Sequence, residues 1–264
     1  MINKNSALIW LPKIEATGLP VPKTVTVPYE HEQIVTFLEG GGDKSNLDSL
    51  RETIALACTE IGYPCFLRTD LASAKHMGPG WYLATGPEDL NRVILRTVED
   101  NEKKFWFESM VKGGGPQAFM VRQFLDLDHS FTAFRGLPIS REWRMFAGPD
   151  GLICGHPYWP KESIEFWEGT ETPRDWESRL AEHHREPDNF KELTDMAVQA
   201  VKACGGGEWS VDFAMDKSGK WWLIDMALKE DSWHWPGCPH GPAPEQTTGN
   251  DAVYLESLVE RRNP

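Results

Sequence analysis

Two aspartates near the C-terminus, each in a short apolar stretch, are the residues best suited to carry chemistry. Asp212 lies in the expected strand Trp209–Met215, and Asp225 lies in the expected strand Lys220–Ala227. Alternation along the second strand places Asp225 on the same face as Leu223. A carboxylate in a buried strand is costly to desolvate unless a cation meets it. If the strands pair so that the aspartates converge, a hard divalent cation such as Mg²⁺ is the natural occupant. The alternative is an edge hairpin whose aspartates face water.

A loop rich in small residues follows a strand that ends in an arginine. The expected strand Tyr63–Arg68 delivers Arg68 to the loop Asp70–Gly80, in which Lys75 is the one lysine. Small residues let the backbone approach a ligand, and the two cations could neutralise a polyphosphate. The loop lacks the GxxxxGK[ST] order of a Walker motif, and an ordinary surface lysine would give the same pattern.

Two further arginines belong to the stretch ISREWRMF, in which Arg141 and Arg144 straddle the expected strand Glu142–Ala147. Arg144 lies between apolar neighbours, where an unpaired guanidinium would be costly. A phosphate or an acidic side chain must therefore meet it, and the two possibilities weigh equally.

The stretch MVRQFLDLD ends a buried strand in alternating polar residues, which would suit a hinge between two lobes. The backbone of Gln123, Phe124 and Leu125 could pair with an adenine edge, and Asp126 or Asp128 could accept hydrogen bonds from ribose hydroxyls. A strand that simply leaves the core explains the pattern equally well.

Composition limits the classes of function. The chain has 264 residues, enough for one large domain or two lobes, and a net charge of -13. That charge argues against a nucleic-acid or anionic-membrane surface, because phosphate binding needs clustered Lys and Arg. Five scattered cysteines without a CxxC favour reduced thiols. With no apolar run suited to a signal peptide or a membrane span, we expect a cytoplasmic protein.

The order of expected elements predicts an α+β fold with mostly antiparallel sheets. Besides the strands above, we expect strands at Ala7–Leu11, Thr24–Val27, Trp81–Thr85, Phe119–Leu125, Ser130–Phe134 and Leu152–Tyr158. Helices are expected at Leu47–Ile61, Glu88–Asp100, Asn189–Cys204 with Asp188 as its cap, and Asp251–Arg262, with a loop and a short helix in Trp159–Glu186.

Five motifs in this order resemble the ATP-grasp superfamily over roughly residues 18–230: GLPVPKT, FLRTDLASAKH, VRQFLDL, REWRMF and SVDFAM with WWLIDMA. The sequence is most similar to the clade marked by two arginines and a lysine, which includes phage and bacterial proteins and the eukaryotic initiation-factor assembly chaperones. The resemblance implies two α+β lobes that grip a nucleotide. It suggests an N-terminal segment at 1–62, a small lobe at 63–125 and a large lobe with the metal hairpin at 126–264.

The resemblance also implies a role for each motif. Arg68 and Lys75 would contact the phosphates of ATP, and Arg144 the γ-phosphate or an acyl-phosphate. Asp212 and Asp225 would hold Mg²⁺.

The remaining implied contacts lie at the hinge and beside the expected strand Glu142–Ala147. Residues 123–125 would form the adenine hinge, with Asp128 as a further nucleotide contact. Arg141 joins Lys75 and Arg144 as a predicted catalytic residue.

The implied activity is an ATP- and Mg²⁺-dependent ligase that joins a carboxylate to an amine or thiol through an acyl-phosphate. Its substrates would be an amino acid, a peptide or a protein terminus, and no protein nucleophile is required. The main alternative is an ATP-binding assembly chaperone that grips a protein partner without ligation. A magnesium-dependent nuclease built on the two aspartates is a distant third possibility, which the charge disfavours.

One departure from the family concerns the metal. Many members carry Asn two residues after the second metal carboxylate, where this chain has Ala227, so Glu230 or Asp231 would have to supply a missing ligand. His234, Cys238 and His240 suggest zinc, but their spacing matches no common structural site, and an aromatic lid is the preferred interpretation of that segment.

Overall fold

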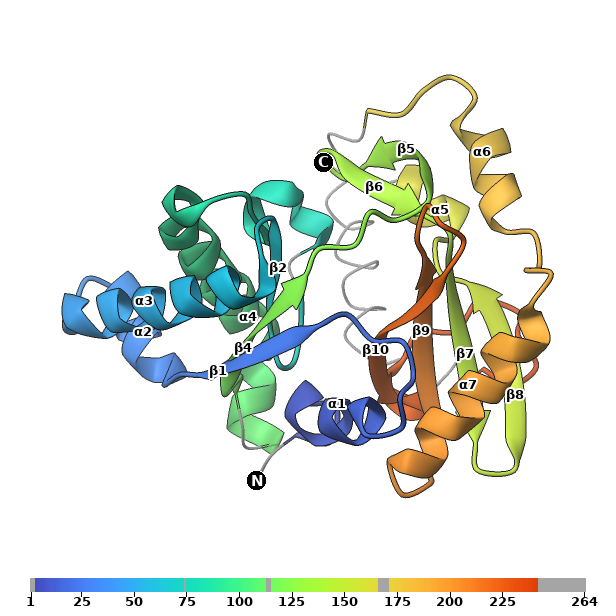
Figure 1. Ribbon diagram of the computed structural model, residues 1–264, viewed down its shortest axis with the longest axis horizontal. Helices are drawn as coiled ribbons and strands as arrows, with labels where there is room; N and C mark the ends of the chain where they lie inside the picture. The colour runs from blue at the N-terminus through green and yellow to red at the C-terminus, as the bar shows by residue number, and fades with distance from the viewer. Residues whose placement is uncertain (1–2, 74, 113–114, 166–170, 242–264) are drawn as a thin grey trace, which may run out of the picture.

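Two four-stranded antiparallel sheets, one in each of two lobes, form the framework of the protein (Figure 1). The computed structural model describes residues 3–73, 75–112, 115–165 and 171–241. The helices are α1 Ala7–Glu15, α2 His31–Leu38, α3 Lys44–Ile61, α4 Leu90–Lys112, α5 Lys161–Glu165, α6 Trp176–His183 and α7 Phe190–Ala203. The strands are β1 Thr24–Pro28, β2 Cys65–Thr69, β3 Leu83–Ala84, β4 Ala118–Gln123, β5 His129–Ala133, β6 Leu137–Ser140, β7 Glu142–Gly148, β8 Gly151–Pro157, β9 Trp209–Met215 and β10 Trp221–Leu228.

The small lobe contains the sheet β1-β4-β2-β3, with α3 and α4 packed against it and α2 packed on those two helices. Asp43 caps α3, because its carboxylate accepts a hydrogen bond from the backbone of Ser45 at 2.9 Å. Alternation along β4 sends Phe119 and Val121 into the core under the helices. Met120 and Arg122 therefore emerge on the opposite face.

The large lobe contains the sheet β10-β9-β7-β8, with α7 lying along one face (Figure 1). Trp143 and Met145 of β7 and Val211 of β9 pack against α7 in the core. The polar residues between them along the strands must then project from the other face. A third, smaller core lies between the β5–β6 pair and helices α5 and α6.

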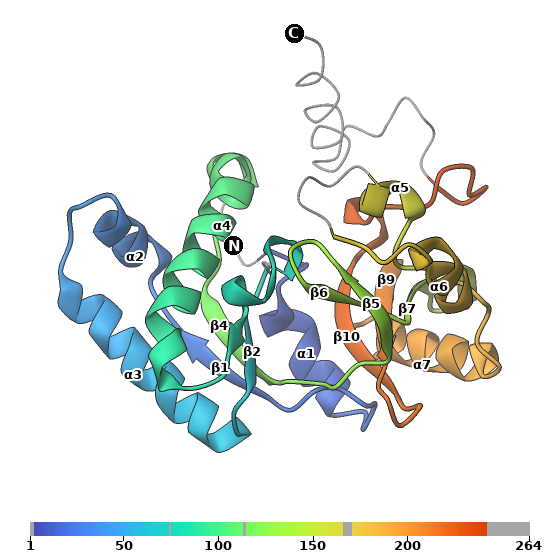
Figure 2. The same ribbon diagram turned by 90° about the horizontal axis from the view of Figure 1, so that it is seen from above.

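Helix α1 lies between the two lobes (Figure 2). Trp10 and Ile14 join the core of the large lobe, while the backbone of Ala7 donates a hydrogen bond to Asp70 of the small lobe at 2.8 Å. The strand expected at Ala7–Leu11 is therefore wrong. The segment is helical because the Ser6 hydroxyl caps its first turn and because its buried residues recur at helical spacing over a longer stretch than the five residues of the expected strand.

The other strands and helices expected within the described residues are present, with specific corrections, among them the strand expected at Trp81–Thr85, which is only Leu83–Ala84 and follows a 3-10 turn that ends at Trp81. The α+β class and the antiparallel sheets are as expected. Helix α2 and strand β6 were not expected, and α4 continues to Lys112, well beyond Asp100. Asn189, rather than Asp188, precedes α7, and its side chain makes no capping bond to the helix.

Two other expectations are left open by the structure, and two further findings concern the cysteines and the helices. The helix expected at Asp251–Arg262 lies outside the described residues. The division into 1–62, 63–125 and 126–264 stays a prediction. All five cysteines lie in the described ranges and are free thiols. In the described part of the chain, every helix is too short or too polar to cross a membrane.

Candidate functional site

The β9–β10 hairpin brings the two predicted metal ligands together. The strands pair antiparallel with Asp212 opposite Asp225, and a β-bulge separates Leu223 from Asp225. Leu223 lies in the core opposite Phe213, so strict alternation would have placed Asp225 in the core as well. The bulge moves Asp225 onto the face of Asp212, which corrects the simple alternation expected for this strand.

Arg144 meets one of these aspartates directly. It lies opposite Asp212 across the β7–β9 ladder, and its Nε and Nη2 donate to Oδ1 and Oδ2 of Asp212 at 2.8 and 2.9 Å. Its Nη1 donates to the carbonyl of Trp233 at 3.2 Å, and its guanidinium lies 4.9 Å from the ring centre of Tyr158. Burial acts to lower the pKa of Arg144, but the Asp212 carboxylate raises that pKa by a larger amount, so the guanidinium stays charged. The partner of Arg144 in this structure is thus an acidic side chain.

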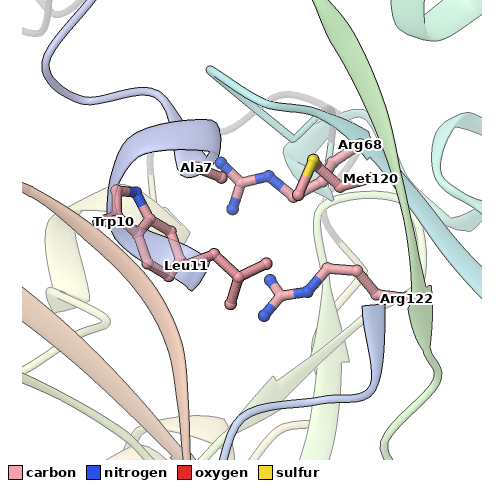
Figure 3. Close-up of a pocket in the computed structure, with 6 residues that line it drawn as sticks. All are labelled: Ala7, Trp10, Leu11, Arg68, Met120 and Arg122. Carbon is pink, nitrogen blue, oxygen red and sulfur yellow. The ribbon is translucent and has the colours of Figure 1, made fainter. Parts of the chain in front are cut away.

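The small lobe contributes two arginines, Arg68 and Arg122, which line one pocket together with residues of α1 (Figure 3). Arg68 of β2 is buried, and its Nη1 lies 2.8 Å from Oδ2 of Asp225. Arg122 of β4 donates from Nη1 to the carbonyl of Ile224 at 2.7 Å. The Nε and Nη2 of Arg122 are buried and have no hydrogen-bond partner among the described residues.

Electrostatics make the position of Arg122 unusual. Burial, and then the neighbouring Arg68, lower the pKa of Arg122 to about 10. A buried guanidinium with unused donors beside a second guanidinium is stabilised by an added anion. This is the first indication from the structure that the region is built to receive negative charge.

Lys75 completes the set of cations. It begins the 3-10 turn Lys75–Met77, and its Nζ lies 3.2 Å from Oε2 of Glu142. The same Nζ is 4.2 Å from the ring centre of Tyr158 and 4.9 Å from that of Trp159. Burial acts to lower the pKa of Lys75, but the Glu142 carboxylate raises it by more, so the ammonium remains protonated at neutral pH. Glu142 and Arg144 alternate along β7, which places Lys75 and Arg144 over the same face of the sheet.

The cluster formed by these residues, called here the interlobe cluster, contains four cations and three carboxylates. The cations are Arg68, Lys75, Arg122 and Arg144, and the carboxylates are Glu142, Asp212 and Asp225. Carboxylate oxygens are the ligands that Mg²⁺ prefers, and clustered guanidinium and ammonium groups bind phosphate. The donor set therefore fits a magnesium-bound polyphosphate, in which the cations would exchange carboxylate partners for phosphate oxygens.

The predicted adenine hinge lies beside a separate pocket with a volume of about 290 Å³. Its walls are the hinge and the β9–β10 turn, formed by Gln123, Phe124, Leu125, Asp126, Asp216, Lys217, Ser218 and Trp222. The Trp222 indole donates to Oδ2 of Asp216 at 2.7 Å, which fixes one wall of the pocket. The hinge role of residues 123–125 stays a prediction.

Two predicted site residues lie elsewhere. Arg141 precedes β7 and donates from Nη2 to the carbonyl of Glu182 in α6 at 2.9 Å. Asp128 forms backbone bonds with Met215 and Arg141 that join the hinge segment to the large-lobe sheet. The structure thus does not bring Arg141 or Asp128 into the interlobe cluster.

The position that departs from the family pattern offers no side-chain ligand. Ala227 pairs with Ser210 across the hairpin. Asp231 lies in the 3-10 turn after β10, where its Oδ2 accepts a hydrogen bond from Asn5 at 2.8 Å, and Glu230 is exposed.

Sequence reasoning overlooked Glu142 and Arg122. The signal was present, because each is a charged residue within an apolar strand, as Arg144 is. Arg122 lies in AFMVRQ, and its buried guanidinium requires an acceptor by the reasoning applied to Arg144.

The two α+β lobes confirm the fold class expected from the sequence. Solved structures that are similar to this chain include Cdc123 and, at lower TM-scores, ligases of the ATP-grasp type. C-terminally truncated Cdc123 from Schizosaccharomyces pombe superposes with a TM-score of 0.55 at 14% identity, covering 86% of this chain and 84% of that chain. At this identity the likeness shows the fold alone. No family model matches the sequence, and a search of curated proteins gives no match.

Two ligases are similar at lower TM-scores. The ATP-grasp ligase PsnB, complexed with a minimal precursor, gives a TM-score of 0.45 at 14% identity over 98% of this chain and 61% of that chain. The VanG D-Ala:D-Ser ligase from Enterococcus faecalis gives 0.49 at 15% identity over 85% of this chain and 52% of that chain. The chain thus spans about six-tenths of PsnB and about half of VanG.

Proposed function

We propose that the protein binds ATP with Mg²⁺ at the interlobe cluster and uses it to ligate a carboxylate to an amine or thiol. The substrate class is an amino acid, a peptide or a protein terminus. The observation that carries the proposal is the gathering of four buried or half-buried cations around the β9–β10 hairpin. Arg68 and Arg144 pair with its facing aspartates, Arg122 donates to the Ile224 carbonyl next to Asp225, and Lys75 pairs with Glu142 of the adjoining strand β7.

Each part of the cluster has a role in this proposal. Asp212 and Asp225 would hold Mg²⁺, which when bound offsets the negative charge that gathers on the phosphates. Arg68 and Arg122 would bind phosphate oxygens from the small lobe, and Lys75 and Arg144 from the loop and the large lobe.

The ion pairs would have to change partners as the nucleotide binds. Arg144 would release Asp212, and Arg68 would release Asp225, so that the carboxylates are freed for the metal while the guanidinium groups take phosphate. Each group keeps an opposite charge throughout, so neither carboxylate nor guanidinium is left buried and unpaired. The adenine would lie against the hinge, where the pocket of about 290 Å³ is found.

Calorimetric titration with ATP and ADP, with and without Mg²⁺, tests the binding step. We expect magnesium-dependent binding in the micromolar range, and ADP release only when a carboxylate and an amine or thiol are both supplied. Absence of nucleotide binding in all conditions would refute the proposal.

The second candidate function is an ATP-binding assembly chaperone that grips a protein partner. The observation that favours it is Ala227, which provides no side-chain oxygen where a third metal ligand is usual in the resembling family. Such a protein should bind ATP with little turnover under every pair of substrates tested and should co-purify with a partner. A ligase should instead release ADP in proportion to the amide or thioester formed.

A further inference from the structure

Four metal-ligating side chains from two distant segments meet beside the interlobe cluster. Cys154 and His156 lie on β8, and His234 and Cys238 lie in the segment that follows β10. One ligand atom from each residue lies within 4.8 Å of every other. We propose that these four residues bind a zinc ion, which fastens the segment after β10 to the large-lobe sheet.

The backbone explains how the first two ligands are placed. Cys154 and His156 are two residues apart on β8, so both side chains project from one face of the sheet. That face is the one that carries Arg144, since His156 lies opposite Arg144 and Cys154 opposite Phe146 in the β7–β8 ladder. Gly155 between them points to the other face, where a Cβ would lie 3.0 Å from the sulfur of Met145.

The other two ligands are held over this face by packing. The His234 ring stacks on Phe146 with ring centres 3.6 Å apart, and its Nδ1 lies 3.9 Å from Sγ of Cys154. Tetrahedral zinc bonds of roughly 2.0–2.3 Å separate neighbouring ligand atoms by roughly 3.3–3.8 Å. Because the ligand atoms lie within 4.8 Å of one another, the cluster needs to contract by at most about 1.5 Å to coordinate the ion, which side-chain rotation can supply.

A second observation indicates that these side chains bind a metal ion. The Nε2 atoms of His156 and His234 are both buried and have no hydrogen-bond partner among the described residues. A buried ring nitrogen without a partner is costly, and a metal bound through Nε2 of both histidines, beside the two free thiols, would satisfy these two atoms. A set of two thiolates and two imidazoles is the donor set of tetrahedral zinc.

The sequence alone could not assemble this site. The sequence groups His234, Cys238 and His240, whose spacing matches no common zinc site. In the structure the other two ligands are instead Cys154 and His156, about 80 positions earlier in the chain. The site would steady the interlobe cluster, because the carbonyl of Trp233, next to His234, accepts a hydrogen bond from Arg144. The zinc proposal does not depend on the proposed nucleotide activity.

The test is metal analysis of the full-length chain purified with its thiols reduced. We expect roughly one zinc per chain, and Co²⁺ loaded in its place should give the visible absorption of tetrahedral thiolate-bound cobalt. Cys238→Ser and His156→Gln should each lower the bound zinc by about tenfold or more at equal free zinc. Cys204→Ser is the matched control, since Cys204 is a half-buried free thiol at the end of α7, and it should retain the metal.

Three results would overturn the proposal. One is a folded, fully reduced protein that takes up no zinc or cobalt. Another is equal loss of metal in the Cys204→Ser control. The third is a Cys154–Cys238 disulfide, seen by peptide mapping, that persists under the reducing conditions in which metal was offered. If Cys238→Ser does not fold by circular dichroism, the cobalt spectrum of His156→Gln, which keeps both thiols, decides the matter.

Discussion

Breaking the Arg144–Asp212 pair tests the electrostatic reasoning most directly. Asp212→Ala removes both charge-assisted hydrogen bonds from a guanidinium whose side chain is 18% exposed, beside an aspartate that is 7% exposed. Removal of one partner from a buried ion pair costs about 3–5 kcal/mol, because the other charge is left uncompensated. Arg144 keeps the Trp233 carbonyl and the Tyr158 ring, which places the expected loss near the lower limit.

We therefore expect Asp212→Ala to lower the free energy of unfolding by about 3 kcal/mol, which is roughly 150-fold in the unfolding equilibrium. Urea denaturation followed by tryptophan fluorescence and circular dichroism measures it. The double variant Arg144→Met/Asp212→Ala removes the stranded charge, so it should recover much of the loss, with a coupling energy of at least about 2 kcal/mol.

The control is an exposed ion pair on one helix. Lys191 and Asp195 on α7 lie 2.6 Å apart with side chains 87% and 64% exposed, and Asp195→Ala should cost no more than about 0.5 kcal/mol. A loss below about 1 kcal/mol for Asp212→Ala, or additive effects in the double variant, would show that Arg144 is not held by Asp212 in solution.

Three further predictions concern Asp225 and Lys75 of the candidate site and His76, which follows Lys75 in the same 3-10 turn. Asp225→Asn should abolish the magnesium dependence of ATP binding in calorimetry, because the half-exposed carboxylate is a proposed metal ligand, and unchanged affinity would remove Asp225 from the site. Lys75→Ala should weaken ATP by about tenfold or more but leave adenosine binding nearly unchanged, and equal losses would contradict a phosphate contact. Burial, and then the nearby Lys75, lower the pKa of His76 to about 3 in the folded protein. As the pH falls below about 6.5, His76 therefore binds a proton in the unfolded chain but not in the folded one, which favours unfolding. The wild type should then lose about 2 kcal/mol of stability between about pH 7 and 5 that His76→Phe does not lose, and parallel pH curves for the two proteins would refute this.

Local pattern predicted most of the secondary structure, and it failed where a longer context decided the outcome. The segment Ala7–Leu11 has a short apolar run typical of a strand, yet Ser6 caps it and Ile14 extends its helical spacing into α1. The helix α2 was overlooked because it is only eight residues long and follows β1 closely. These errors concern periodicity read over too few residues.

The candidate site was predicted in its residue types more than in its contacts. Arg144 was expected to meet a phosphate or an acid, and the choice depended on Asp212, which is 68 residues away in sequence but opposite it in the sheet. Arg141 is predicted as a further catalytic residue, but it lies before the strand and turns toward α6. Spacing along one strand shows which face a side chain takes, and it does not show what another segment places against that face.

The sequence by itself determined the α+β class, the order of the motifs and the presence of charged residues in apolar strands, because these depend on local periodicity and on the cost of burying charge. Only the tertiary structure decided which charges pair. The bulge before Asp225 exchanges the faces of β10, and the return of the chain after β10 brings His234 and Cys238 to β8. Both are consequences of long-range packing, which no short window of sequence contains.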